Sequence, residues 1–422
     1  MIPTLAAAIA IPYPPFSMET PVTLTLLLDL DDTLLGNQID TFVSSYTRLL
    51  ARHLSASVDP KLLVQQLQAA TGFMLAHQRP DQTLEENFSS LFYPKIGLSR
   101  TVAQPFIDDF YSRVFPTLKQ YTQIIPACAA LVKGAFERGY RVAIATNPLF
   151  PRTAILQRLN WAGADPQDYP FALVPDYEAF HFAKPNPAFY AELLARLDWP
   201  DGPVVMVGDS IDNDVTAARQ MGLAAFWISK DGLQPAQGLL APNASGSLAD
   251  VLPWLQTVSL TAPDFNNPQA AQAVLLSTPA VLHSLRKEVP IEGWLKPPAP
   301  HEWCLAEIVC HLRDVETEVN LPRLKKMVDE NNPFLPGMDT DPWVLQRNYI
   351  SQDCLQALDD FIAARMESIA LLEKLEPTAW LRTARHSILG PTKLQEIVGI
   401  TASHDRLHIQ QTHQVLRLTS VS

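Results

Sequence analysis

The sequence predicts an α/β domain built on a doubly wound parallel sheet, followed by an all-α four-helix bundle. Three short apolar runs, VTLTLLLDL, YRVAIATN and GPVVMVGD, are spread over the first 230 residues and have the length of fully buried strands. Helical patterns lie between them, and strands that alternate with helices are typical of a parallel sheet. Beyond residue 267, segments of helical periodicity follow one another with no strand between them, as in a helix bundle.

Length and composition agree with this division. The chain has 422 residues, about two to three times the usual size of a domain. Its net charge of −12 disfavours nucleic acid as a partner, because a phosphate backbone attracts basic surfaces. No apolar run reaches the roughly eighteen residues of a membrane-spanning helix, so a membrane is not expected as a partner. The four cysteines show no Cys-x-x-Cys spacing, so a disulfide framework is not indicated and a reducing cytoplasm is expected.

The segments follow in a simple order along the chain. We expect a disordered lead at residues 1–21, since it lacks the basic start of a signal peptide, and Met18 is an alternative start to Met1. The first domain then covers residues 22–255. Its stretch at about 37–123 is helix-compatible with no clear strand, which predicts an inserted helical cap. A polar, turn-prone linker at 256–266 precedes the bundle at 267–422, with helices expected at 268–289, 302–328, 354–375 and 393–418.

Polar side chains follow each of the three apolar runs. Asp29 and Asp31 come after the first run, Thr146 ends the second and Asp209 ends the third. The carboxyl ends of parallel strands share the edge of the sheet at which ligands bind, so we expect these side chains to meet. Carboxylates this close repel one another unless a cation such as magnesium lies between them. Of two such carboxylates, one can attack as a nucleophile while the other exchanges protons. An acid cluster that only caps helices is the alternative.

The ordered set of DxDxT, a threonine, Lys-Pro and GDSxxND resembles the haloacid dehalogenase-like hydrolases over roughly residues 22–255. The resemblance implies that Asp29 is the nucleophile and forms an aspartyl-phosphate. Asp31 is then the general acid/base, and its backbone carbonyl also contacts Mg²⁺. Thr146 is expected to bind phosphate, Lys184 to orient the nucleophile and the phosphate, and Asp209 to complete the magnesium shell. Thr33, which shapes the turn, and Asp214 are supporting residues.

The same resemblance favours one branch of the family. Dehalogenases displace a halide and lack an acid at the position of Asp31, whereas phosphatases need it to protonate an alkoxide. Members with a helical insertion after the first motif use it as a cap that selects small substrates. We therefore expect a magnesium-dependent phosphoric monoester hydrolase that acts on a small phosphorylated metabolite.

A second group of candidate ligands lies in the C-terminal part. His404 and His408 are four residues apart in ITASHDRLHIQQTHQ and share one helical face, which continues an apolar stripe. His311 lies on the apolar stripe of AEIVCHLRDVE. Three histidines from two helices of a bundle make a metal site with open positions. A chance histidine pair is the alternative, and His301 and His413 are expected on the surface.

The segment from about residue 267 to the end resembles the DinB-like four-helix bundle family. PAPHEWCLAEIVCHLRDVE has its Trp-x-x-x-Glu-x-x-x-His-Leu pattern, and HDRLHIQQ has its His-x-x-x-His pattern. The resemblance implies a divalent metal, Zn²⁺ or Ni²⁺ among them, on His311, His404 and His408. Because some members transfer low-molecular-weight thiols, the bundle could be the main active domain as a thiol transferase. It could also be only a binding or dimerisation module of a homodimer. A metalloprotease pattern fits poorly, since Asp405 stands in place of the glutamate.

Overall fold

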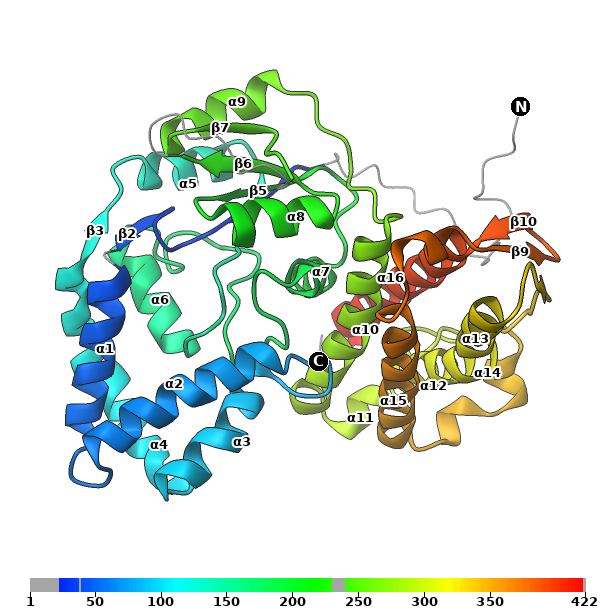
Figure 1. Ribbon diagram of the computed structural model, residues 1–422, viewed down its shortest axis with the longest axis horizontal. Coiled ribbons are helices and arrows are strands. Elements are labelled where there is room, and N and C mark those ends of the chain that lie inside the picture. The colour runs from blue at the N-terminus through cyan, green and yellow to red at the C-terminus, as the bar shows by residue number, and fades with distance from the viewer. Residues whose placement is uncertain (1–22, 38, 230–239, 420–422) are drawn as a thin grey trace.

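The computed structural model describes residues 23–37, 39–229 and 240–419. The expected disordered lead and the alternative start at Met18 lie outside the described residues, as do residues 230–239 of the first domain. Figure 1 shows a sheet with flanking helices and a helical cap on one side, and a helix bundle on the other. The predicted fold class, a doubly wound α/β domain followed by a helical bundle, is confirmed.

A five-stranded parallel sheet forms the centre of the first domain, in the order β4-β1-β5-β6-β7. Its strands are β4 (Arg141–Ile144), β1 (Thr25–Leu28), β5 (Val204–Gly208), β6 (Ala224–Ile228) and β7 (Ala244–Gly246). Every residue of β1 and β5 is buried, because helices cover both faces of the sheet. Alternate residues therefore enter two different cores: Leu26 and Leu28 lie in one, and Leu27 lies in the other.

Helices cover the two faces in the doubly wound manner. One face carries α5 (Cys128–Glu137), α6 (Arg152–Trp161) and α9 (Val251–Thr257), and the other carries α7 (Pro187–Arg196) and α8 (Ala217–Gln220). A single turn of π-helix, Ile211–Thr216, precedes α8. Asn186 caps the first turn of α7 through a side-chain oxygen that accepts from the Ala188 backbone N–H. This cap places the residues just before α7 at the carboxyl edge of the sheet.

Five helices lie between β1 and β4, and α5 is the last of them; the first four are α1 (Ile39–His53), α2 (Pro60–Ala76), α3 (Leu84–Ile96) and α4 (Arg100–Asp109). A capping box of Thr83 and Glu86 starts α3. One turn of π-helix at Phe110–Val114 and a 3₁₀ helix at Phe115–Tyr121 complete the helical part. The expectation of no strand in this stretch was wrong at its ends, because β2 (Leu35–Asn37) and β3 (Thr122–Ile124) pair antiparallel where the chain leaves and rejoins the sheet. Three-residue strands are too short to give a periodic pattern.

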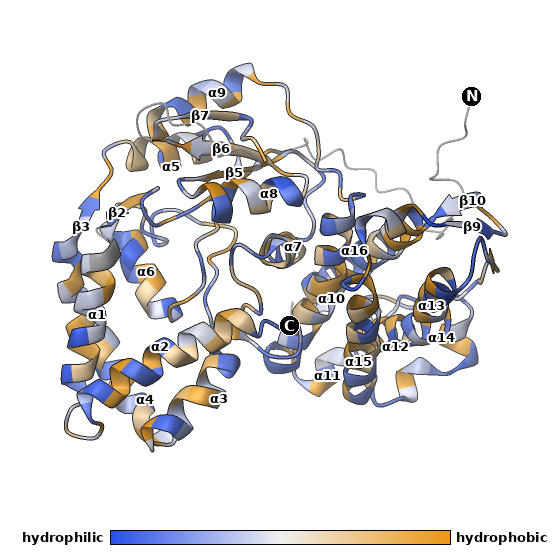
Figure 2. Cartoon of the chain, viewed as in Figure 1, coloured by the Kyte–Doolittle hydropathy of each residue, from blue (hydrophilic) through white to orange (hydrophobic). Residues whose placement is uncertain are grey.

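The C-terminal part contains the four expected long helices: α10 (Pro268–Glu288), α12 to α13 (Leu305–Val315 and Leu321–Asp329, joined by the π-turn Glu316–Asn320), α15 (Cys354–Leu372) and α16 (Leu394–Thr419). Figure 2 shows α15 orange along most of its length, as suits a helix inside a bundle. Short helices α11 (Ile291–Trp294) and α14 (Trp343–Gln346) and the 3₁₀ turns Tyr349–Ser351 and Pro377–Leu381 fill the connections.

Strands in the bundle were not predicted. β9 (Thr383–His386) and β10 (Gly390–Lys393) form a hairpin before α16, and β8 (Phe334–Leu335) pairs with β9 in parallel. The hairpin is short, and Gly390, the first residue of β10, takes a positive φ of 75°, a conformation that glycine adopts without strain. None of the described helices combines the length and the apolar character that crossing a membrane requires.

Candidate active site and metal centre

The carboxyl edge of the sheet gathers the polar residues that follow β4, β1 and β5. These strands are neighbours in the sheet, and Leu28 is in register with both Ile144 and Val207. The Asp29 backbone N–H donates to the Val207 carbonyl at 3.0 Å, which extends the ladder by one residue. Asp29, Thr146 and Asp209 therefore come out of the sheet side by side, at the edge where parallel sheets bind ligands.

Three carboxylates meet at this edge. Oxygens of Asp29, Asp209 and Asp214 lie within 4.8 Å of one another. Asp214 reaches the group because the chain turns sharply after β5, where the Ser210 backbone N–H donates to Asp214 Oδ2 at 2.9 Å. Gly208 makes room for this turn, since a Cβ there would lie 2.3–2.5 Å from the Asp214 side chain. Asp214, which was expected from the sequence as a supporting residue, is thus a member of the carboxylate group.

Lys184 provides the positive charge among these acids. Its Nζ lies 2.9 Å from Asp29 Oδ1 and 2.5 Å from Asp214 Oδ1, and its side chain is almost fully buried. Burial opposes the charged ammonium, but the Asp214 and Asp29 carboxylates outweigh it and raise the pKa of Lys184. Burial and the charge of Asp29 raise the pKa of Asp209 to about 6. Burial and the charge of Asp29 also raise the pKa of Asp214, to about 7, although the Lys184 ammonium opposes this shift.

Asp31 lies apart from this group, although its sequence position is close. Its side chain forms an ion pair with Arg158 and accepts a hydrogen bond from the Asn37 amide. Arg158 comes from α6, is 2% exposed, and packs its guanidinium 5.2 Å from the Phe42 ring centroid and 5.4 Å from that of Phe150. Burial lowers the pKa of Arg158 to about 10, against the opposing effect of Asp29. Sequence reasoning missed Arg158; the only signal is an arginine inside the apolar helical segment TAILQRLNWAG.

Two buried hydroxyls at the site have no hydrogen-bond partner among the described residues. They are the side-chain oxygens of Thr33 and Thr146. A buried hydroxyl left unpaired costs about 1–3 kcal/mol, so such groups in native proteins usually have a ligand or water as partner. The free hydroxyl of Thr146, beside crowded carboxylates and a buried lysine, suits a ligand that offers acceptor oxygens. The carboxylate group itself suits a hard divalent cation such as Mg²⁺.

The three predicted histidines converge in the bundle. His311 of α12 and His404 and His408 of α16 face one another, with Nε2–Nε2 distances of 3.3 Å (His311 to His404) and 3.1 Å (His408 to His404). Nitrogen ligands of a tetrahedral zinc ion lie about 3.3 Å apart, given metal–nitrogen bonds of about 2.0–2.1 Å. Burial lowers the pKa of His404 to about 4, that of His408 to about 3 and that of His311 further still, so all three are neutral at pH 7. Neutral imidazoles at this spacing fit a transition metal.

Residues around the histidines hold their rings in place. His408 Nδ1 lies 2.9 Å from Gln411 Oε1, and the ring of Trp303 stacks on His408 with an interplanar angle of 8°. Such partners orient metal-binding imidazoles. The Nδ1 atoms of His311 and His404 are buried without a partner among the described residues.

A buried network of ion pairs includes Asp405, the residue next to His404. Arg365 of α15 pairs with Glu316 at 2.8 Å and with Asp405, and all three side chains are no more than 1% exposed. The carboxylate of Asp405 therefore forms an ion pair with Arg365. It is not free to activate water as the glutamate of a metalloprotease does. The prediction that His413 lies on the surface was wrong: it is half-buried, and its Nε2 lies 2.8 Å from the Ala195 carbonyl of the first domain. His301 is exposed, as expected.

Comparisons with known proteins agree with this division. Residues 23–222 match the haloacid dehalogenase-like hydrolase family, and residues 275–412 match the DinB superfamily. The comparison with curated proteins found no match.

Similar solved structures fall into the same two groups. A HAD phosphatase from Thermococcus onnurineus is 21% identical, with 55% of this chain and 98% of that chain covered and a TM-score of 0.37. A 2-haloacid dehalogenase from Pseudomonas syringae pv. Tomato DC3000 is 22% identical, with 56% and 98% covered and a TM-score of 0.40. YfiT from Bacillus subtilis, described as having an unusual four-helix bundle topology, is 20% identical, with 38% and 91% covered and a TM-score of 0.34.

Proposed function

Because residues 23–222 match the haloacid dehalogenase-like hydrolases, we propose that the protein is a magnesium-dependent phosphatase of a small phosphorylated metabolite. Residues 275–412 match the DinB superfamily, and we propose a second, transition-metal site in this bundle. The observation that carries the proposal is the meeting of Asp29, Asp209 and Asp214, with the Lys184 ammonium paired to Asp29 and Asp214 and with the unpartnered hydroxyl of Thr146 at the same edge of the sheet. This set can attack, neutralise and hold a phosphoryl group.

Mg²⁺ would be held by Asp29, Asp209 and the backbone carbonyl of Asp31, with Asp214 beside them. It would supply positive charge to the oxygens of the phosphoryl group. Asp31 needs no place in the carboxylate group for this role, because its backbone rather than its side chain would hold the ion.

The residues of the chain carry the chemistry. The Asp29 carboxylate attacks phosphorus, and the bond from phosphorus to the ester oxygen breaks while an aspartyl-phosphate forms. Thr146 donates a hydrogen bond to a phosphoryl oxygen, and Lys184 neutralises charge on the phosphate. Asp31 gives its proton to the departing alkoxide, then removes one from the water that hydrolyses the aspartyl-phosphate. The products are an alcohol and inorganic phosphate.

The presence of an acid at Asp31 supports a phosphatase over a dehalogenase. Arg158 pairs with the Asp31 side chain and holds it apart from the carboxylate group. A halide needs no proton, so a dehalogenase gains nothing from an acid held in this way. Proton delivery to an alkoxide does need an acid at a set position.

The test compares Asp29→Asn with a matched control, Asp212→Asn, in which an exposed aspartate of the turn after β5 is changed. With Mg²⁺ and para-nitrophenyl phosphate, we expect Asp29→Asn to abolish turnover and Asp212→Asn to retain it. Undiminished turnover in Asp29→Asn refutes the nucleophile. Halide release from a 2-haloacid without phosphatase activity would assign the other branch of the family.

A second comparison isolates Asp31. Nitrophenolate leaves without a proton, whereas the alkoxide of an alkyl phosphate requires one. We expect Asp31→Asn to slow the hydrolysis of alkyl phosphates more than that of para-nitrophenyl phosphate. Equal losses on both substrates would show that Asp31 is not the acid.

In the bundle, we propose that His311, His404 and His408 bind a divalent transition metal such as Zn²⁺ or Ni²⁺. Three ligands leave coordination positions open, and this favours a second candidate function, the transfer of a low-molecular-weight thiol, whose deprotonation a metal held there would favour. Consumption of glutathione with an electrophile, lost in His311→Ala, would support it. No thiol consumption by metal-loaded protein would leave metal binding as the role of the bundle.

A further inference from the structure

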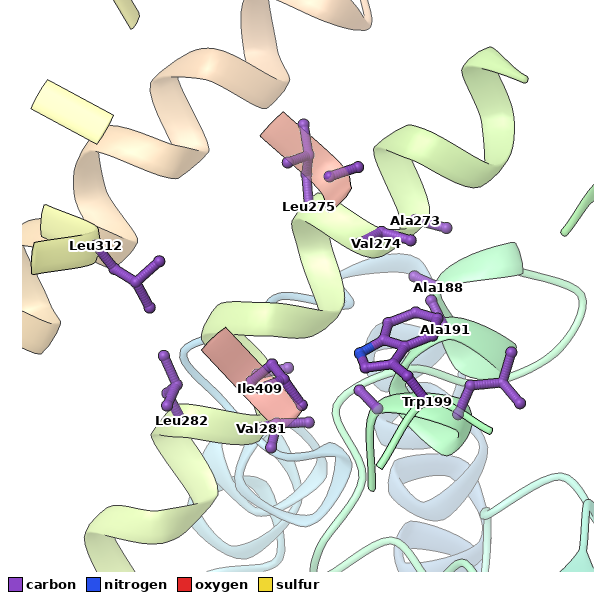
Figure 3. Packing of buried hydrophobic residues seen from close by; sticks show 14 of the residues in the cluster. Ala188, Ala191, Trp199, Ala273, Val274, Leu275, Val281, Leu282, Leu312 and Ile409 are labelled. Atoms are coloured by element: carbon purple, nitrogen blue, oxygen red, sulfur yellow. The ribbon is translucent and has the colours of Figure 1, made fainter. Parts of the chain in front are cut away.

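Helix α10 belongs to the bundle but is buried on both sides. All residues from Ala270 to Leu285 are buried except Gln272 and Leu276. Figure 3 shows α10 between Leu312 of α12 and the first-domain residues Ala188, Ala191 and Trp199. Residues of α7 and α10 belong to one continuous hydrophobic core. The two domains therefore share a core through α7 and α10.

The loop that carries Lys184 lies directly against α10. In this loop His181 is completely buried, and its Nε2 lies 3.0 Å from Nδ1 of His283 on α10. On its other side, His181 Nδ1 lies 2.9 Å from Glu192 Oε1 of α7. Glu192 Oε2 also accepts from the backbone N–H groups of His181, at 3.0 Å, and Phe182, at 3.2 Å. A carboxylate of α7 and an imidazole of the bundle thus hold His181 between them.

One proton in this chain of contacts follows from the partner of His181. A carboxylate only accepts, so Nδ1 of His181 carries a proton and donates to Glu192. The Nε2 atom of His181 and the Nδ1 atom of His283 share one hydrogen bond, in which one nitrogen donates and the other accepts. Burial, and then the neighbouring His181, lower the pKa of His283 to about 4, which keeps it neutral at pH 7. Removing the His283 imidazole leaves a buried nitrogen of His181 without its partner.

The residue after His283 contacts the same loop. Arg196 of α7 donates through Nη2 to the Ala179 carbonyl and to Ser284 Oγ of α10, both at 2.6 Å. On the opposite side, Gln78 of the helical cap accepts from the Ala183 backbone N–H at 2.9 Å. The segment from Ala179 to Ala183 is therefore fixed by the bundle on one side and by the cap on the other, immediately before Lys184.

We propose that His283, a residue of the DinB superfamily bundle, is a positioning residue for the hydrolase site. It holds His181, and through it the loop that brings Lys184 Nζ to Asp29 and Asp214. The bundle then completes the catalytic loop of the first domain, in addition to any chemistry of its own. This inference rests on the proposed role of Lys184 in phosphate hydrolysis.

The test uses the full-length protein with Mg²⁺ and three variants. His283→Leu removes the hydrogen bond to His181, and His283→Asn restores a side-chain amide, which can donate or accept, near the Nδ1 position. The matched control, His413→Leu, removes another contact between the domains, from α16 to the Ala195 carbonyl at the far end of α7. Phosphatase kcat and KM are measured for each, with thermal unfolding to exclude misfolding. Amide hydrogen exchange over residues 179–184 reports the loop itself.

We expect kcat to fall about ten- to a hundredfold in His283→Leu, since a misplacement of about 1 Å in a catalytic group costs rates of this order. His283→Asn should recover most of the loss, and His413→Leu should change kcat less than twofold. The amides of residues 179–184 should exchange faster in His283→Leu alone. Equal kcat in the two leucine variants, or unchanged exchange in His283→Leu, overturns the proposal.

Failure of the proposed function gives a different result. If the wild-type protein hydrolyses no phosphate ester, the phosphatase assignment fails, and kinetics cannot be compared. Faster exchange of residues 179–184 in His283→Leu would still support the restraint of the loop by the bundle, and unchanged exchange would still overturn it.

Discussion

The crowded carboxylates make a strong prediction for Lys184→Met. In metal-free protein, this variant leaves Asp29, Asp209 and Asp214 together without the ammonium that lies 2.9 Å from Asp29 and 2.5 Å from Asp214. Removing one partner of a buried ion pair costs about 3–5 kcal/mol, because the remaining charge stays buried and unpaired. Asp214, whose pKa burial already raises to about 7, can take up a proton and so keep the loss within this range. We expect the free energy of unfolding to fall by about 3–5 kcal/mol in EDTA.

Thermal unfolding followed by circular dichroism measures this loss. For a domain of about 150–250 residues it corresponds to a fall in Tm of about 6–20 °C. The control is Lys325→Met, which breaks a surface pair with Glu367 whose side chains are 47% and 53% exposed, and which should cost less than about 1 kcal/mol. Added Mg²⁺ should stabilise Lys184→Met at least as much as wild type, since an ion bound only by the native state raises its stability. A loss no larger than that of Lys325→Met would refute the buried cluster.

Three further predictions concern other residues. His404→Ala should lower the bound transition metal to background, because two imidazoles cannot hold it as three do; metal analysis of purified protein measures this. Arg158→Met should lower kcat for alkyl phosphates about tenfold or more, because Asp31 loses the cation that orients it. His283→Asn should make stability less sensitive to pH between about 6.5 and 4. The unfolded state binds a proton at His283 in this window and the folded state does not, so wild type loses up to about 3 kcal/mol as the pH falls.

Each of these has a control. His301→Ala, an exposed histidine, should leave the metal content unchanged; equal metal in His404→Ala would exclude the histidine site. Arg158→Lys should retain part of the rate, and a full rate in Arg158→Met would remove Arg158 from the site. For His283, the groups whose charges act on it are His181, Glu86, Arg286 and Lys287, so the curves are compared at one ionic strength. Parallel stability curves for wild type and His283→Asn would contradict the buried, neutral imidazole.

Local patterns predicted much of the fold and part of the candidate site. A buried strand has a recognisable length and composition, and recognising the strand also identifies the residue that follows its carboxyl end. Asp29, Thr146 and Asp209 could therefore be expected at one edge of a sheet. The pair His404 and His408 follows in the same way from helical periodicity. Lys184 lies in a loop without such a pattern, and only the resemblance to a family suggested it. The roles of these residues stay predictions until the variants are measured.

Other residues could not be found from local patterns. Arg158 meets Asp31 across 127 positions, and His283 meets His181 across 102. Nothing near Arg158 in the sequence separates a buried arginine from one that extends to solvent, since both occur on helices with an apolar face. The hairpin of β9 and β10 was missed for a different reason, because four-residue strands leave too few alternations to count.

Periodicity and strand-end chemistry, both properties of short segments, determined the two fold classes, the carboxyl-edge acids and the histidine pair on one helical face. Only the tertiary structure decided which charges pair. It turned Asp31 towards Arg158, brought Asp214 and Lys184 into contact, and set His283 of the bundle against the loop of the hydrolase domain. The physical reason is that burial makes unpaired charges and hydrogen-bonding groups costly, and their partners are chosen by how helices and loops from distant parts of the chain pack together.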